Sequence, residues 1–220
     1  MPEIITTSDG SHTLYVPELD EHYHSVHGAI RESMHIFIGA GYEAQKSGQA
    51  DIFEIGFGTG LNAFLTALRA RQDNRPVRYT AIEKYPLGPD ITGSLNYCTF
   101  TGEQTRTLFD AIHTSPWDRQ VDITSGFSLL KIQGDLTSFR HSGTHNLIYF
   151  DAFGPDKQPE MWSQEVFETI ASITVKGGIL VTYSAKGEVK RNLRDCGFEV
   201  SLLPGPPGKR QIIRAVKIQD

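Results

Sequence analysis

The sequence contains two cysteines, Cys98 and Cys196, which are too few for a disulfide framework or for a zinc site built from cysteine pairs. It has no apolar run of about 18 residues, the length that a transmembrane helix needs. The first residues, Met1-Pro-Glu-Ile-Ile-Thr6, also lack the basic and then apolar pattern of a secretion signal. We therefore expect no membrane span and a cytoplasmic location.

The sequence also lacks an excess of positive charge. Its net charge is −5, whereas a nucleic-acid-binding domain is typically strongly basic. Any contact with RNA must therefore depend on local patches. Four histidines near the N-terminus could suggest a metal site, but no cysteine or carboxylate pattern accompanies them, so we interpret them as loop and pocket residues and expect no metal. These histidines are His22, His24, His27 and His35.

The most informative segment is Asp51-Ile-Phe-Glu-Ile-Gly-Phe-Gly-Thr-Gly-Leu-Asn62. It reads as a buried strand, a turn with glycines at two-residue spacing (Gly56, Gly58 and Gly60), and the start of a helix. Such a turn presents free backbone N–H groups and a positive helix end to a ligand. A dinucleotide-binding turn has the spacing G-x-G-x-x-G, and Glu54 would repel a pyrophosphate. A carboxylate there suits the sulfonium and ammonium groups of S-adenosylmethionine; a dinucleotide site and an ordinary turn remain the alternatives.

The rest of the chain alternates strand and helix patterns, which predicts a doubly wound α/β fold in a single domain, 1–220. We expect strands over 52–56, 77–83, 146–151, 178–183, 198–203 and 211–218, and helices over 61–71, 121–133, 161–174 and 188–196. The short Pro/Gly connection 204–210 requires its two strands to pair antiparallel. A mostly parallel, Rossmann-like sheet with an antiparallel last strand is typical of class I S-adenosylmethionine-dependent methyltransferases.

Two segments lie outside this core pattern. Residues 1–45 form an N-terminal extension with a small hairpin over 7–15, and residues 87–118 form an insertion after the second core strand. Additions of this size near the strand ends usually shape the pocket for a substrate.

Acidic residues end three of the expected strands. Glu83 is placed to accept both ribose hydroxyl protons, although it could also be a surface glutamate. Asp135 follows Ile132-Gln-Gly134, which we expect to end the third core strand just after 121–133, and it could accept from the adenine amino group or only form a turn. Asp151 ends the next strand, beside the expected methyl group; its alternative role is to cap the helix that follows.

Three motifs together resemble the MnmC-like tRNA (5-methylaminomethyl-2-thiouridylate) methyltransferases, and the resemblance covers nearly the whole chain. They are Glu54-Ile-Gly-Phe-Gly-Thr-Gly-Leu-Asn62, Asp151-Ala-Phe-Gly-Pro155 with Pro159-Glu-Met-Trp162, and Pro204-Gly-Pro-Pro-Gly-Lys-Arg210. The block Tyr23-His-Ser-Val-His-Gly-Ala-Ile-Arg-Glu-Ser33 resembles the segment that precedes the cofactor strand in that family.

The resemblance implies methyl transfer to the amine of 5-aminomethyluridine at the tRNA wobble position. It implies a cofactor site made of Glu54, Gly56, Gly58, Gly60, Asn62, Glu83, Asp135 and Asp151, and an acceptor site made of Tyr23, His24, Phe153, Lys209 and Arg210. Lys209 and Arg210 lie in a loop that could contact phosphate or be a plain surface turn. Many members carry a further flavin-dependent domain; this chain ends after the last expected strand, so we expect no flavin.

An aliphatic amine is largely protonated at neutral pH and must lose a proton before it can attack a methyl group. Asp151 is our candidate for steering and deprotonating it. Two other functions remain open: methylation of a small amine or another RNA, and a non-catalytic binding module on the same fold. The intact glycine turn and the carboxylates Glu54, Glu83 and Asp151 argue against the last of these.

Overall fold

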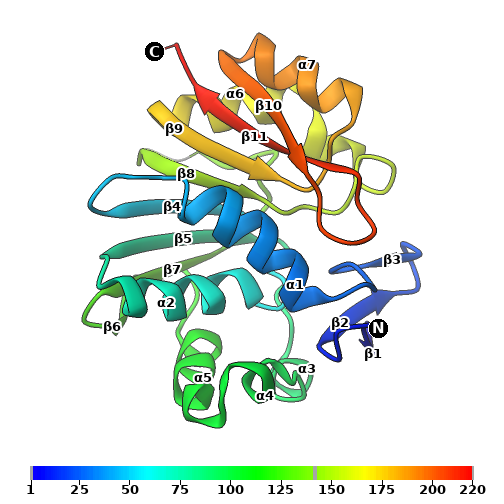
Figure 1. Cartoon of the computed structure of the whole chain (residues 1–220), viewed down its shortest axis with the longest axis vertical. Helices are drawn as coiled ribbons and strands as arrows, with labels where there is room; N and C mark the ends of the chain where they lie inside the picture. The colour runs from blue at the N-terminus through cyan, green and yellow to red at the C-terminus, as the bar shows by residue number, and fades with distance from the viewer. Residues whose placement is uncertain (1, 141–142, 220) are drawn as a thin grey trace.

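The computed structural model describes residues 2–140 and 143–219 and contains an eight-stranded and a three-stranded β-sheet (Figure 1). The strands are β1 (Glu3–Thr6), β2 (His12–Val16), β3 (Glu21–His22), β4 (Ala50–Ile55), β5 (Val77–Glu83), β6 (Val121–Thr124), β7 (Phe127–Gln133), β8 (His145–Phe150), β9 (Thr174–Thr182), β10 (Phe198–Pro204) and β11 (Gln211–Lys217). The helices are α1 (Ala29–Ser33), which continues as a π-helical segment η1 (Met34–Tyr42), then α2 (Leu61–Asp73), α3 (Pro89–Thr92), α4 (Tyr97–Thr101), η2 (Glu103–Thr105), α5 (Arg106–Thr114), η3 (Pro159–Trp162), α6 (Gln164–Ile173) and α7 (Gly187–Asp195).

The strand order in the large sheet is β10-β11-β9-β8-β4-β5-β7-β6. Strands β9, β8, β4, β5 and β7 run parallel, and β11, β10 and β6 are antiparallel to their neighbours. The order reverses direction between β4 and β8, and the crevice at such a point is where α/β sheets bind ligands. The predicted fold class and the antiparallel final hairpin are confirmed.

Helices cover both faces of this sheet because its central strands are apolar on both sides. Ile52 of β4 packs with α2 and η1, whereas its neighbour Phe53 packs with α6 and α7 on the opposite face. Successive strand residues point to opposite faces, so a continuous apolar run is what a doubly covered strand requires. No helix in the described part of the chain combines the length and apolar character that a bilayer crossing needs.

The helix expected over 121–133 is wrong, because this segment forms the antiparallel strands β6 and β7. Phe127, Leu129 and Lys131 are buried in alternation along β7, the two-residue period of a strand. The third buried position is a lysine, whose ammonium donates to the carbonyls of Ile112 and His113 at 2.9 and 2.8 Å. Because one of the buried positions is a charged residue, the alternation of apolar and polar residues that is typical of a strand is incomplete in this segment of the sequence.

The N-terminal extension contains the expected hairpin, in which β1 pairs with β2 and Ile4 lies opposite Leu14. Strand β3 completes this small antiparallel sheet. Leu14 and Ala29 belong to the same buried cluster as the central strands, so the extension packs on the core. In Figure 1 the small sheet lies beside the N-terminal end of α1, and the β10–β11 loop reaches toward it.

Candidate active site

A cavity of about 540 Å³ opens at the carboxyl ends of β4, β5 and β8, where the strand order reverses. Its wall also includes residues 21–26 of the extension, the segment that follows β8, and Lys209 of the β10–β11 loop. This volume lies within the range of pockets that enclose a small molecule.

The glycine turn lies at the base of the cavity, and two of its glycines have no room for a side chain. Gly56 has φ +85°, and a Cβ there would lie 2.7 Å from the carbonyl oxygen of Asp151. Gly58 has φ +48°, and its Cβ would lie 2.9 Å from the ring of Tyr23. Gly60 adopts the left-handed conformation immediately before α2. The spacing noted in the sequence thus reflects close approach to β8 and to the extension.

Glu83 ends β5 on the cavity wall and is tied to the glycine turn. Its Oε2 accepts from the N–H of Gly58 at 3.0 Å, and its Oε1 accepts from the N–H of Tyr85 at 2.8 Å. These bonds fix the carboxylate at the strand end that the sequence indicated for the ribose.

Asn62 connects two carboxylates. Its Nδ2 donates to Glu54 Oε1 at 3.0 Å and to Asp151 Oδ2 at 2.8 Å. Glu54 is fully buried and is not part of the cavity wall, so it lies beneath the site instead of facing a ligand as expected. Burial raises the pKa of Glu54 well above its usual value, and the nearby charge of Asp151 raises it further. Glu54 therefore orients Asn62, and Asn62 orients Asp151.

Asp151 follows β8 and lies on the cavity wall. Burial, followed by the negative charge of Glu32, raises the pKa of Asp151 to about 7, although the Asn62 hydrogen bond and the charge of Lys209 lower it. A carboxyl with a pKa near neutrality can accept and release a proton under physiological conditions.

Aromatic side chains surround Asp151. Tyr23 and Phe153 meet edge to face with ring centroids 5.1 Å apart, and both line the cavity. Trp162 Nε1 donates to the carbonyl of Phe153 at 2.7 Å, and the Tyr183 hydroxyl donates to the carbonyl of Ala152 at 2.8 Å. The segment that carries Asp151 is therefore held from two sides. No motif in the sequence indicated that Tyr183 belongs to the site.

His24 is buried at the edge of the cavity. Its ring nitrogens lie 3.3 Å from Thr13 Oγ1 and 3.4 Å from Thr59 Oγ1, so it joins the extension to the glycine turn. Burial lowers its pKa to about 4, which leaves the imidazole neutral at pH 7.

Asp135 also lines the cavity, but its carboxylate already has partners. Oδ2 pairs with Lys84 Nζ at 2.8 Å, and Oδ1 accepts from the N–H and the hydroxyl of Thr137. The hydrogen bond from Lys84, followed by those from Thr137, lowers its pKa to about 2. Asp135 is thus ionised and fixed in a turn, and its contact with adenine stays a prediction.

The two basic residues of the β10–β11 loop lie in different environments, one at the surface and one in the cavity wall. Arg210 is exposed, whereas Lys209 lies on the cavity wall with its Nζ 2.8 Å from Glu32 Oε1. The expected phosphate contact of Lys209 does not agree with this position, because its ammonium already neutralises a buried carboxylate. Sequence reasoning missed Glu32, which reads as an ordinary residue on a short helix.

Residues 87–118, all of which the structure describes, contribute nothing to the cavity wall, so the expectation that they shape the pocket is wrong. They form a helical connection between β5 and β6. Within it, His113 and Trp117 contact Phe57 with ring centroids 5.9 and 5.8 Å apart. This segment therefore supports the glycine turn from behind.

The chain resembles known proteins in sequence and in structure. Residues 118–218 match a family described as S-adenosyl-L-methionine-dependent methyltransferase. The chain is 32% identical over 212 residues to the tRNA 5-methylaminomethyl-2-thiouridine biosynthesis bifunctional protein MnmC of Cupriavidus necator. The aligned residues cover 90% of this chain and 32% of that protein. It superposes on MnmC2 from Aquifex aeolicus with a TM-score of 0.81 and 26% identity, over 100% of this chain and 71% of that one.

The chain is an MnmC-like S-adenosylmethionine-dependent methyltransferase domain. It spans about a third of the length of the curated relatives it matches. The amino pentose methyltransferase CalS10 from Micromonospora echinaspora, solved with S-adenosylmethionine, shares the fold with a TM-score of 0.51 and 13% identity, over 86% of this chain and 92% of that one.

The residues of this methyltransferase domain fit its cofactor. Asn62 lines the cavity, and its buried Oδ1 finds no hydrogen-bond partner among the described residues, so it is available to a donor group of the cofactor. We expect Gly56 and Gly58 to border the cofactor and Glu83 to hold its ribose. In the part of the chain that the structure describes, no group of three or more histidines, cysteines, aspartates and glutamates is arranged to hold a metal ion.

We predict that Glu83→Ala weakens S-adenosylmethionine binding by roughly 1.5–3 kcal/mol, or about 10- to 150-fold, because hydrogen bonds to a charged group are lost. Isothermal titration calorimetry on the substrate-free protein measures this directly. Glu199→Ala, an exposed position on β10, is the matched control and should bind as the wild type does. Unchanged affinity of the Glu83 variant would remove this residue from the site.

Proposed function

We propose that this domain transfers a methyl group from S-adenosylmethionine to the amine of 5-aminomethyluridine, with or without a 2-thio group, at the wobble position of tRNA. The name of its relative MnmC, a tRNA 5-methylaminomethyl-2-thiouridine biosynthesis protein, supports a tRNA uridine as the substrate. The proposal rests mainly on the position of Asp151 on the wall of the cavity, where burial raises the pKa of its carboxyl to about 7.

The acceptor amine explains why such a carboxyl is useful. The cofactor supplies a methyl group that is already electrophilic, so the protein has to position the amine and remove its proton. Ionised Asp151 attracts the alkylammonium and accepts one of its protons, which frees the nitrogen lone pair for attack. A nitrogen–carbon bond forms as the sulfur–carbon bond breaks, and Asp151 later releases the proton to water. Asn62 holds Oδ2 of Asp151, so the other oxygen is directed to the amine.

The aromatic wall suits a nucleobase. Tyr23 and Phe153 lie beside Asp151 and are only partly buried. Bases that leave an RNA stack commonly pack on such rings. A base held there would share the cavity wall with Asp151.

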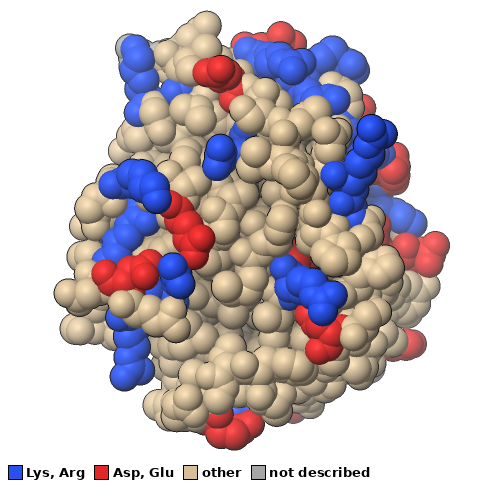
Figure 2. Space-filling view, in the orientation of Figure 1, with Lys and Arg blue, Asp and Glu red and all other residues tan. Residues whose placement is uncertain are grey.

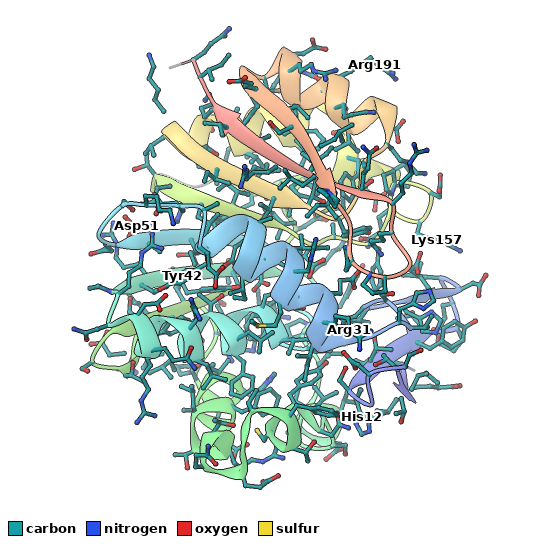
Figure 3. The ribbon with its side chains drawn as sticks, in the orientation of Figure 1. His12, Arg31, Tyr42, Asp51, Lys157 and Arg191 are labelled. Atoms are coloured by element: carbon teal, nitrogen blue, oxygen red, sulfur yellow. The ribbon has the colours of Figure 1, made fainter. Side chains whose placement is uncertain are left out.

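Local positive charge is available for RNA despite the acidic composition. Figure 2 shows lysine and arginine side chains gathered over α7, and Figure 3 shows Arg191 projecting outward from this helix. Exposed cations among the described residues include Arg191 and Arg194 on α7, and Arg210 in the β10–β11 loop is exposed as well. Because Lys186, just before α7, lines the cavity, this helix begins at the edge of the site. We assign these three arginines to phosphate contacts.

The test compares acceptors. The purified protein is incubated with S-adenosylmethionine and either tRNA that carries 5-aminomethyluridine or free small primary amines, and the products are identified by mass spectrometry. We expect 5-methylaminomethyluridine in the tRNA and no methylation of the free amines. Methylation of the small amines without the tRNA would assign the domain to small-molecule metabolism, and cofactor binding without any methyl transfer would indicate a binding module.

A further inference from the structure

The cavity wall contains an ion pair that the mechanism above does not use. Glu32 of α1 and Lys209 of the β10–β11 loop meet at 2.8 Å, with side chains only 8% and 27% exposed, respectively. The second oxygen of Glu32 accepts from the N–H of Ser25 at 2.7 Å, and the Lys209 ammonium lies 4.9 Å from the centroid of the Tyr183 ring. Both charges are therefore held in place, unlike those of a typical surface pair.

Packing around the loop fixes the pair further. The ring of His35 donates through Nε2 to the carbonyl of Pro204 at 2.8 Å, at one end of the loop. Gly208 has φ +87° and lies against the His27 ring, so that a Cβ would come within 2.1 Å of it. The N–H of Lys209 donates to the carbonyl of Pro206 at 2.9 Å. The loop is thus docked on the extension, with its lysine directed inward.

The pair also lies close enough to Asp151 to influence its charge. Tyr183, which contacts the Lys209 ammonium, donates to the residue after Asp151. Glu32 raises the pKa of Asp151, and Lys209 lowers it. Among the described residues, the titratable groups around Asp151 also include Glu54 on β4, Tyr79 on β5, Tyr183 itself and Tyr23 of the extension, and burial raises the pKa of each of them.

We propose that the Glu32–Lys209 ion pair keeps a buried carboxylate near Asp151 neutralised, and that both residues act on methyl transfer through Asp151. This inference rests on the proposed function. Without Lys209, two carboxylates would face each other across the site, and Asp151 would retain its proton to higher pH. Without Glu32, an unpaired ammonium would repel the cationic acceptor.

The experiment measures kcat/KM against pH for tRNA that carries 5-aminomethyluridine. Lys209→Met should move the acidic limb of the profile up by roughly one pH unit, and Glu32→Gln should move it down by a similar amount. Glu32→Gln should also raise KM for the tRNA about tenfold, because the remaining ammonium repels the acceptor. The double variant should return close to the wild-type profile, since both charges are gone.

Matched variants separate charge from structure. Lys209→Arg keeps the cation and should keep the wild-type midpoint. Lys157→Met removes a lysine that pairs with Asp20 at 3.8 Å, outside the cavity wall, and should leave the profile unchanged. A purely structural pair would lower the melting temperature of both single variants without moving their midpoints in opposite directions, and that result would overturn the inference.

A substrate-free measurement distinguishes this inference from the proposed function. The carboxyl carbon of Asp151, assigned with Asp151→Asn in protein labelled with ¹³C-aspartate, is titrated by NMR in the wild type and in each variant. Opposite shifts of its midpoint in Lys209→Met and Glu32→Gln support the inference even if the tRNA is not methylated, an outcome that would refute only the substrate. Equal midpoints in all variants would refute the inference even if the tRNA is methylated.

Discussion

Replacing Asp151 with asparagine is expected to slow methylation of the tRNA amine by roughly 10²–10⁴-fold, the usual contribution of a general base. The amide keeps the size of the side chain and can still accept from Asn62, but it cannot take a proton. The fold and much of the cofactor affinity should remain. Single-turnover rates at saturating cofactor measure the chemical step, and the loss should shrink at high pH, where more of the amine is already neutral.

Asp151→Asn should also change the free energy of unfolding, and measuring that change shows whether a loss of activity reflects a loss of folded protein. The pKa of Asp151 is about 7 in the folded protein against an ordinary value of 3.8, so between these values the folded state binds more protons than the unfolded state. The free energy of unfolding therefore falls as the pH rises from about 4 to about 7. Asp151→Asn removes this contribution and should be at least as stable as the wild type at pH 7. Full methylation activity in a stable Asp151→Asn protein would contradict the assignment of the base.

The second large effect concerns the choice between two modified uridines. We expect the domain to methylate 5-aminomethyluridine in tRNA and to leave the carboxymethylaminomethyl form unchanged. The nitrogen of the latter is already secondary and crowded, and its carboxylate would approach Asp151 at the cavity wall, where like charges repel. Converting it to the free amine requires oxidative cleavage of a carbon–nitrogen bond, which needs an electron acceptor such as a flavin.

Each tRNA form is offered separately with S-adenosylmethionine, and the nucleosides are then analysed by mass spectrometry. The aminomethyl form should convert fully, and the carboxymethylaminomethyl form should be recovered intact. Removal of its carboxymethyl group by the purified chain, or a flavin absorbance in that chain, would disprove this selectivity.

The cofactor half of the site could be predicted from local sequence, because its geometry depends on neighbours in the chain. The Gly56–Gly60 turn follows a buried strand directly, and parallel strands bring Glu83 and Asp151 to the same sheet edge. These features require only strand direction and spacing. Glu54 was misplaced because its position in the motif does not show which side of β4 faces the ligand.

The acceptor half could not be predicted in the same way. Glu32 and Lys209 come from opposite ends of the chain, and no periodicity indicates that they meet. Lys209 was expected to contact phosphate or to lie in a surface turn, and its inward direction accompanies the docking of Gly208 against His27. The error over 121–133 has a related cause, since the buried position of Lys131 depends on carbonyls in a distant helix.

The position of β11 has a consequence for how this protein comes to be active during its synthesis. β11 follows all the other described strands in the chain, yet it inserts between β9 and β10, and the loop before it delivers Lys209 to the cavity. The glycine turn, Asp151 and the acceptor-wall residues Tyr23, Glu32 and Phe153 are made earlier, so a nascent chain can contain them while Lys209 is still absent. Domains generally fold as units, and pairings between distant segments form slowly. Insertion of the final strand therefore completes the acceptor wall, so that partly synthesised chains hold the donor half of the site without the ion pair that governs its base.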